Sequence, residues 1–306
     1  MDFSLLLGKM FIFVVLMVVG YLFGRKGYVS KGFITDASKL TINFFMVATI
    51  LNSVISSEID LSTRDMLLSI AIMTASTVIC YIVGAVVSRT VRLPADRRPS
   101  VELLLAVVNN VFICLPIVQA AYGPEAVFHI SMSGLPYNAI LYSYGVWRMN
   151  SGGGDVQVNF KKIMSPPLIA TLAAIVIFVF RIPMPYVVKD LVSSLSAATM
   201  PLSMLVVGAS LGSVSLMEAF NDKSSYVVAF FSLIVTPLLA WLILPCFVSD
   251  PTLLKTAIIY AACPSGLVVT VLSVQYDRDY VFTSKATLLS TVISMATLPI
   301  WVYILG

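Results

Sequence analysis

Asn109-Asn110-Val111-Phe112-Ile113-Cys114-Leu115-Pro116 places two amides and a proline inside an otherwise apolar segment of this chain. Pro116 supplies no backbone donor and its ring clashes with the carbonyl four residues earlier, so a helix through this stretch has to loosen. In lipid every backbone polar group needs a partner, so a loosened helix there must face protein or a water-filled cavity. A second break, Cys263-Pro264-Ser265-Gly266, lies in the other half of the chain. Two broken helices in corresponding halves of a membrane protein predict a transport site.

The composition is that of a protein with most of its length in a bilayer. Of 306 residues, 59% are hydrophobic and 11% are charged, against about 25% charged residues in soluble domains. The mean hydropathy of +0.97 agrees, so we expect a polytopic membrane protein. The net charge of +4 does not imply nucleic acid as a partner. The four cysteines lie far apart without metal-binding or disulfide spacing; they are Cys80, Cys114, Cys246 and Cys263.

The apolar stretches predict an all-α fold with ten spans of about 20 residues each. We place them at residues 4–24, 35–56, 66–89, 100–121, 125–148, 163–182, 187–214, 224–248, 253–275 and 280–305. The longest loop contains Ser151-Gly152-Gly153-Gly154-Asp155, a composition typical of flexible linkers. We therefore expect a five-span half at 1–149, a linker at 150–161 and a second five-span half at 162–306.

The basic residues predict the orientation. Alternate loops carry twelve of them, whereas the opposite loops carry only Arg64, Arg181, Lys189 and Lys255. The basic loops should face the cytoplasm, which leaves both termini outside the cell membrane and the linker inside. The twelve are Arg25, Lys26, Lys31, Arg89, Arg92, Arg97, Arg98, Arg148, Lys161, Lys162, Lys223 and Arg278.

The two halves read as an inverted repeat. At an offset of 154 residues the first break coincides with the second, and a few identities recur on either side. Five spans per half is an odd number, so the second half must enter the membrane from the opposite side. Such a repeat brings both breaks to a common site near the midplane. The coinciding positions are Asn110 with Pro264, Tyr122 with Tyr276, Val127-Phe128 with Val281-Phe282, and Val47 with Pro201.

An ordered set of motifs resembles the auxin efflux carrier family, which in turn is similar to the bile-acid sodium symporters. The matching segments are Ser38–Met46, Asn109–Pro116 with Tyr122–Ala126, Tyr137-Asn138, Pro201–Leu211, Cys263–Gly266 and Gln275-Tyr276. One residue departs from the family pattern, because Val47 stands where the family usually has proline. We therefore expect less of a kink in span 2.

The resemblance implies ten helices in two inverted repeats, with broken spans 4 and 9 crossing at their midpoints. It also implies a scaffold of spans 1, 2, 6 and 7, often dimeric, and a moving transport domain of spans 3–5 and 8–10. The cargoes that it implies are small carboxylates, such as malate, malonate, lactate-like acids or indole-acetate.

The breaks themselves favour an anion site. Each second half of a broken helix begins with free backbone donors and a positive dipole end. Asn109 and Asn110 add amides, Ser265 a hydroxyl, and Gly266 allows close backbone approach. The alternative for the asparagines is hydrogen bonding between helices. The full set of predicted substrate-binding residues is Asn43, Asn109, Asn110, Pro116, Tyr137, Asn138, Pro201, Cys263, Pro264, Ser265 and Gly266.

Charged residues are placed near the ends of the predicted spans. A carboxylate relay for protons needs acids at the midplane, and no predicted span has one there. Coupling to Na⁺ or H⁺ stays open, with no resident cofactor or metal. Lys39, Glu102 and Lys285 lie one to two turns inside the cytoplasmic face. They are candidates for an inner gate, the alternative being snorkelling lysines and ordinary ion pairs.

Two sequence features could suggest an enzyme, but each has a structural interpretation that we favour. Gly208-Ala209-Ser210-Leu211-Gly212 matches a nucleophile elbow, but it lies in an apolar helix and favours helix packing. His129, the single histidine, is expected to be packed or interfacial. We therefore predict a secondary carrier of organic anions and not an enzyme. The alternatives are a sodium-coupled symporter of the bile-acid type and an anion channel or membrane sensor.

Overall fold

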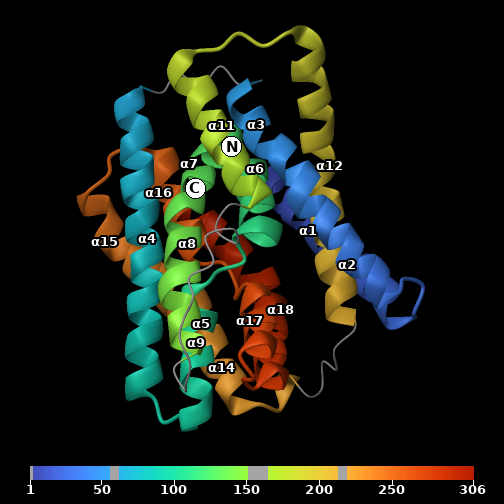
Figure 1. Cartoon of the computed structure of the whole chain (residues 1–306), viewed down its shortest axis with the longest axis vertical. Helices are drawn as coiled ribbons and strands as arrows, with labels where there is room; N and C mark the ends of the chain where they lie inside the picture. Colours follow the sequence, from blue (N-terminus) through green and yellow to red (C-terminus); the bar gives the residue numbers. More distant parts are fainter. Residues whose placement is uncertain (1–2, 56–61, 151–164, 213–218) are drawn as a thin grey trace. The chain divides into compact units, whose positions relative to one another are not determined.

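The computed structural model describes residues 3–55, 62–150, 165–212 and 219–306, and every regular element in these residues is a helix (Figure 1). The stretches in this part of the chain that are long and apolar enough to cross a membrane are Gly32–Ile55, Thr63–Thr90, Tyr186–Gly212, Lys223–Cys246 and Tyr280–Leu305. Shorter apolar helices cover Phe11–Arg25, Asn110–Tyr122 and Pro166–Phe180. The prediction of an all-α polytopic membrane protein is confirmed, whereas the count of ten spans stays a prediction. The linker predicted at 150–161 lies, apart from Asn150, outside the described residues.

The chain divides into two compact units, each assembled from separate parts of the sequence. The first unit comprises Met1–Ala71, Val111–Gly134 and Met164–Ser213. The second unit comprises Ile72–Asn110, Leu135–Ile163 and Val214–Gly306. Both units therefore contain residues from each predicted half of the chain.

The first unit is built around α1 and α12, which pack along one another (Figure 1). The α3 helix packs against α11 and α12, and α6 contacts α1 and α12. Its elements are α1 (Phe3–Arg25), α2 (Lys31–Leu40), η1 (Thr41–Phe45), α3 (Met46–Ile55), the start of α4 (Thr63–Thr90), α6 (Leu115–Tyr122), α7 (Pro124–Met132), α11 (Pro166–Phe180) and α12 (Tyr186–Gly212).

Glycines bring α1 and α12 into backbone contact. A Cβ atom on Gly20 would lie 2.3 Å from the Leu205 carbonyl oxygen, and one on Gly208 would lie 2.1 Å from that of Met17. The prediction that the Gly208–Gly212 motif serves helix packing is confirmed. Ser210 donates its hydroxyl to Val207 O at 2.8 Å inside the continuous helix α12, so it does not occupy the strand-to-helix turn of a nucleophile elbow.

Span 2 departs from α-helical geometry although Val47 replaces the family proline. A π-helical turn, η1, ends just before Met46. The Phe45 carbonyl accepts hydroxyl hydrogen bonds from Thr49 at 3.1 Å and from Thr199 at 3.0 Å. In α12, by contrast, Pro201 lies inside an uninterrupted helix. A proline is therefore neither required for the irregular turn in span 2 nor sufficient to break α12.

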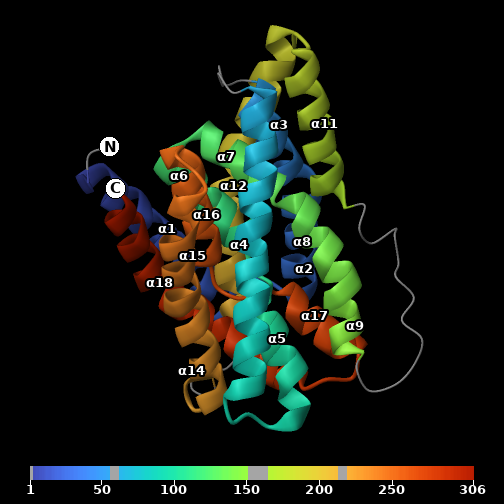
Figure 2. The ribbon, with the colours of Figure 1, turned by 90° about the vertical axis from the view of Figure 1, so that its left-hand side faces the viewer.

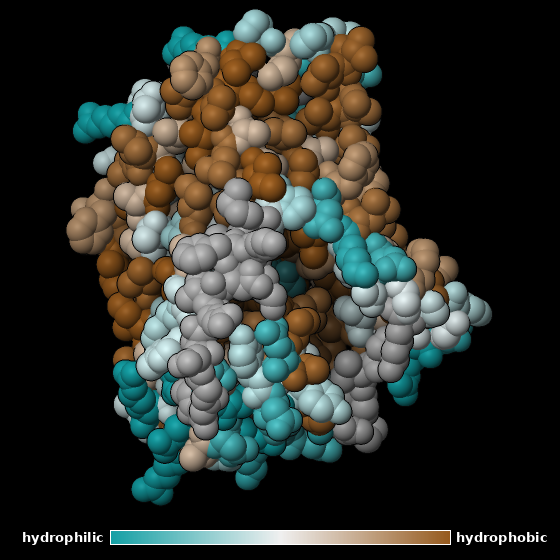
Figure 3. Space-filling model, viewed as in Figure 1, coloured by the Kyte–Doolittle hydropathy of each residue, from teal (hydrophilic) through white to brown (hydrophobic). Residues whose placement is uncertain are grey.

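The outward surfaces of α11 and α12 are apolar (Figure 3). Ile169, Leu172, Val176, Val187 and Leu191 are all exposed there. Soluble monomers rarely expose apolar patches larger than a few hundred Å². This surface is therefore suited to contact with lipid.

The second unit contains the interrupted helices, and α18 packs against α14, α16, α17 and α5 within it. Figure 2 shows α14, α15 and α16 near α18. Its elements are most of α4, η2 (Ala95–Arg97), α5 (Arg98–Ala106), most of α8 (Gly134–Ile140), η4 (Leu141–Gly145), α9 (Val146–Met149), α14 (Lys223–Phe230), η5 (Phe231–Val235), α15 (Thr236–Ile243), η6 (Leu244–Cys246), α16 (Pro251–Ala261), α17 (Val268–Gln275) and α18 (Tyr280–Leu305).

The helices of the second unit are joined by hydrogen bonds as well as by apolar contacts. Ser76 donates to the Ala257 carbonyl at 2.8 Å, and the Trp301 indole donates to the Leu233 carbonyl at 2.9 Å. Tyr260 and Phe282 are among its fully buried side chains. Hydrogen bonds between helices, together with close van der Waals packing, drive helix association in lipid, where the hydrophobic effect does not act between helices.

Candidate functional site

The backbone that leads into the first predicted break meets the second predicted break inside the second unit. The α5 helix ends at Ala106 and is followed by extended backbone at Val107, while α16 ends at Ala261 and α17 begins at Val268. Val108 and Ser265 form an isolated antiparallel bridge. The predicted crossing of broken spans 4 and 9 is therefore confirmed.

The crossing satisfies backbone groups that the breaks expose. The backbone N–H of Asn109 donates to the Pro264 carbonyl at 2.7 Å, and the backbone N–H of Gly266 donates to the Val107 carbonyl at 2.7 Å. A Cβ atom on Gly266 would lie 3.1 Å from Val108 O and 3.2 Å from Val107 O. Glycine thus permits this approach, and the two chain segments replace the intrahelical bonds that membrane helices require.

Ser265 fastens the crossing to neighbouring helices. Its hydroxyl donates to the Leu104 carbonyl at 2.6 Å, near the end of α5 where carbonyls lack intrahelical partners. Its amide donates to the Ser290 hydroxyl of α18 at 3.4 Å. The side chain is fully buried. Its hydroxyl hydrogen is therefore committed to the Leu104 carbonyl.

Several predicted site residues gather at the crossing. Asn109 is buried, and the Tyr137 hydroxyl lies 3.5 Å from the Val108 carbonyl. Cys263 and Pro264 are also buried there. Asn138, next to Tyr137 on α8, is half-buried.

Asn110 begins a second π-helical turn, η3 (Asn110–Cys114), which continues into α6. Pro116 is the second residue of α6. In a regular α-helix its ring would clash with the carbonyl of Phe112, four residues earlier. Phe112 lies in η3, and the wider π-helical turn relieves this clash. The loosening predicted around this proline is confirmed.

The remaining predicted residues belong to the first unit. Pro116 is buried in α6, Asn43 is exposed in η1, and Pro201 is half-buried in α12. Lys39 is exposed and pairs with Asp36 at 3.4 Å on α2. Their participation in a common site with the crossing stays a prediction.

Glu102 has a buried set of partners that the sequence did not suggest. Its carboxylate is fully buried on α5 and accepts hydrogen bonds from Arg148 Nε at 2.8 Å and from the Ser88 hydroxyl at 3.1 Å. The Tyr144 hydroxyl donates to the other carboxylate oxygen. A buried carboxylate needs a paired cation, and Arg148 supplies it from α9. The sequence feature that could have indicated this pair is that Glu102 and Arg148 both lie near the same predicted membrane face.

Lys285 lines a cavity of about 270 Å³ together with Arg97 and Phe282. Arg97 lies 3.2 Å from Asp222 and 3.0 Å from Asp279, and its guanidinium stacks 4.6 Å from the centre of the Phe282 ring. Both acids also cap helices, α14 and α18 respectively. The three predicted gate residues thus have three different environments, and their joint action stays a prediction.

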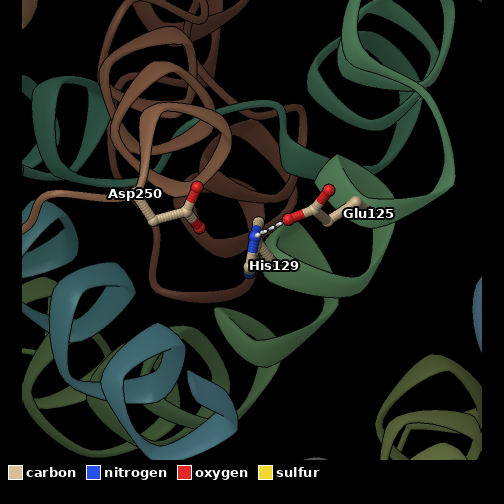
Figure 4. Close-up of side chains that lie close together, drawn as sticks. All are labelled: Glu125, His129 and Asp250. Carbon is tan, nitrogen blue, oxygen red and sulfur yellow. Dashed lines mark ion pairs between the residues drawn. The ribbon is translucent and has the colours of Figure 1, made fainter. Parts of the chain in front are cut away.

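His129 is packed inside the first unit, as expected. Its Nδ1 lies 2.8 Å from the Ser69 hydroxyl, whose hydrogen goes to the Asp65 carbonyl at 2.7 Å. Nδ1 therefore carries the proton toward Ser69. The other ring nitrogen lies 3.7 Å from Glu125, one turn earlier on α7 (Figure 4). Asp250, also drawn there, belongs to the second unit and caps α16.

Comparisons with known proteins agree with the motifs of the sequence. A family model described as membrane transport protein matches residues 5–302. An uncharacterized transporter of Methanothermobacter thermautotrophicus is 22% identical over 299 residues, which cover 95% of each chain. An uncharacterized transporter of Methanocaldococcus jannaschii is 23% identical over 235 residues, which cover 74% of each chain.

Proposed function

This chain belongs to the membrane transport protein family, that of the auxin efflux carriers, and from this premise we propose that it is a secondary carrier of small organic carboxylate anions. The observation that supports this most directly is the crossing of two interrupted helices at buried residues of the second unit. Interrupted helices of this kind form substrate sites in many secondary carriers.

The start of α17 at the crossing suits a carboxylate. The α17 helix begins directly after Gly266 and Leu267. The positive end of a helix dipole favours an anion. The side-chain amide of Asn109 and the hydroxyl of Tyr137 add polar groups at the crossing. Arg148 is engaged by Glu102, so we assign binding to helix ends and amides and not to that cation.

The composition of the two units supports alternating access. The first unit contains α1, α2, α3, α11 and α12, which lie in the proposed scaffold spans 1, 2, 6 and 7. The second unit contains the residues that meet at the crossing and α14 to α18. We propose that the second unit, as the transport domain, moves against the first, with the halves of the chain as inverted repeats and the scaffold as a dimer contact. Residues 66–71 of span 3 and Val111–Gly134 depart from this division by grouping with the first unit.

The direction of transport follows from the driving force. A membrane potential that is negative inside favours anion export by about 2.3 kcal/mol per charge per 100 mV. An uncoupled carrier would therefore work as an exporter, and uptake would require coupling to Na⁺ or H⁺.

The proposal is tested first by a thermal-shift screen of organic acids with the purified protein, with sodium and with choline in its place. Any acid that raises the melting temperature is then tried in counterflow with proteoliposomes. Accumulation of labelled acid against an internal pool of unlabelled acid supports a carrier. Flux without counterflow would indicate a channel instead, and dependence on sodium would indicate a symporter.

We predict that Asn109→Ala lowers counterflow at least about tenfold, because one charge-assisted hydrogen bond contributes roughly 1.5–3 kcal/mol. The matched control is Asn150→Ala, which removes an amide at the end of α9 outside the crossing. Both variants should elute as folded protein in detergent. Normal counterflow by a folded Asn109→Ala protein would exclude Asn109 from the site.

A further inference from the structure

The first unit has an apolar groove whose lining contains no residue assigned to the crossing. It is formed by α1, α2 and α12 and has a volume of about 380 Å³, within the range of roughly 300–1,000 Å³ typical of small-molecule sites. We call it the α1–α2–α12 groove. Its lining includes Phe23, Val29, Phe33, Ile34, Leu205 and Ala209. Every lining side chain is apolar.

A turn after α1 connects two residues that line the groove, Phe23 and Val29. Gly27, with φ of 73°, ends α1; its N–H donates to the Gly24 carbonyl, and the Tyr28 N–H donates to the Phe23 carbonyl. This pair of bonds is the Schellman motif, completed by edge contact between the Phe23 and Tyr28 rings at 5.6 Å. The turn therefore holds its side chains in place relative to the groove.

The same turn presents positive charge beside the apolar groove. Arg25 and Lys26 are both exposed, and Tyr28 is 69% exposed. Tyrosine is enriched at the level of lipid headgroups, where one end of its ring is wet. On α2 the carboxylate of Asp36 is paired with Lys39. Two exposed cations and an exposed tyrosine thus lie in the chain between Phe23 and Val29, which line the apolar groove.

We propose that the α1–α2–α12 groove binds an anionic phospholipid, with one acyl chain in the groove and the phosphate on Arg25 and Lys26. An occupant must be apolar over the length of the groove and negative at its rim, and such a lipid is both. Basic residues beside a membrane helix attract anionic headgroups in this way.

Native mass spectrometry of the full chain in detergent tests the proposal. Phosphatidylglycerol and phosphatidylcholine with the same acyl chains are added separately, and retained lipid is counted per protein. Wild-type protein should retain phosphatidylglycerol in clear preference to phosphatidylcholine. The double variant Arg25→Gln/Lys26→Gln should weaken phosphatidylglycerol retention by roughly tenfold and remove the preference, because each basic residue near the headgroup contributes to binding.

A second variant tests the groove itself. Ala37 lines the groove, and Ala37→Trp should displace both lipids by filling it. The matched controls are Val187→Trp, on the exposed surface of α12, and Arg181→Gln/Lys189→Gln, which removes two charges at the connection of α11 and α12. Both controls should retain phosphatidylglycerol as wild type does.

Three results would overturn the proposal. The first is an unchanged preference for phosphatidylglycerol in Arg25→Gln/Lys26→Gln, whose exposed side chains can be replaced without disturbing the core. The second is unchanged lipid retention in Ala37→Trp. The third is conversion of a dimer to a monomer by Ala37→Trp without loss of lipid, which would make a second copy the occupant.

Discussion

The α1–α12 pair of the first unit and the crossing of the second unit are held together in different ways. In the first unit α1 and α12 approach through glycines, so that backbone contacts backbone without polar side chains between them. In the second unit the helices are interrupted and meet through exchanged hydrogen bonds and a buried ion pair. Two helices whose backbones are in direct contact fit together in one arrangement, so their relative position resists change. Hydrogen bonds between separate segments can be exchanged for others, which suits the part of the protein that contains the proposed anion site.

The largest effect is expected from the buried ion pair of the second unit. Arg148→Gln leaves the Glu102 carboxylate buried without its cation, and breaking such a pair typically destabilises a protein by about 3–5 kcal/mol. The free energy of unfolding in a denaturant titration measures this loss. The matched control is Lys39→Gln, because the exposed Lys39–Asp36 pair should contribute about 0–1 kcal/mol. Equal losses from the two variants would show that Glu102 is not held by Arg148.

A smaller loss is expected from overpacking the first unit. Gly20→Ala places a methyl group 2.3 Å from the Leu205 carbonyl oxygen, and overpacking of this kind costs about 1–3 kcal/mol. The melting temperature of the detergent-purified protein reports it. Gly8→Ala is the control in the same helix, since its Cβ would meet nothing within 4 Å. If Gly20→Ala and Gly8→Ala have the same melting temperature, α1 and α12 are not held by backbone contact.

The smallest change in stability is expected at the crossing, where function should suffer more. Gly266→Ala places its Cβ 3.1 Å from the Val108 carbonyl oxygen, so the segments have to separate by only a few tenths of an ångström. We expect a stability loss of about 1 kcal/mol or less but a several-fold fall in counterflow. Gly20→Ala should show the reverse pattern, with the larger change in melting temperature. A Gly266→Ala protein with normal counterflow would separate the crossing from transport.

Much of the framework was predictable because its causes are local. Pro116 and Pro264 lack amide donors whatever surrounds them, so the π-helical turn before Pro116 and the break at Pro264 followed from residue chemistry, whereas the extended backbone at Val107 did not. The small residues from Gly208 to Gly212 likewise predicted close helix packing. The partners of Glu102 were not predictable, because Arg148 lies 46 residues away on another helix. The π-helical turn before Val47 was also missed, since the threonine hydroxyls that bond to Phe45 come from α3 and α12.

The sequence by itself determined the membrane class, the family and the places where helices are interrupted, because apolar length, motif order and proline geometry act within one segment. Only the tertiary structure decided how the interruptions are satisfied. The bond from Asn109 to Pro264 and the bond from Ser265 to Leu104 depend on how two distant helices cross. The groove beside Arg25 also exists only once α1, α2 and α12 are packed. Hydrogen-bond partners and cavities are properties of several segments together, and no single stretch specifies them.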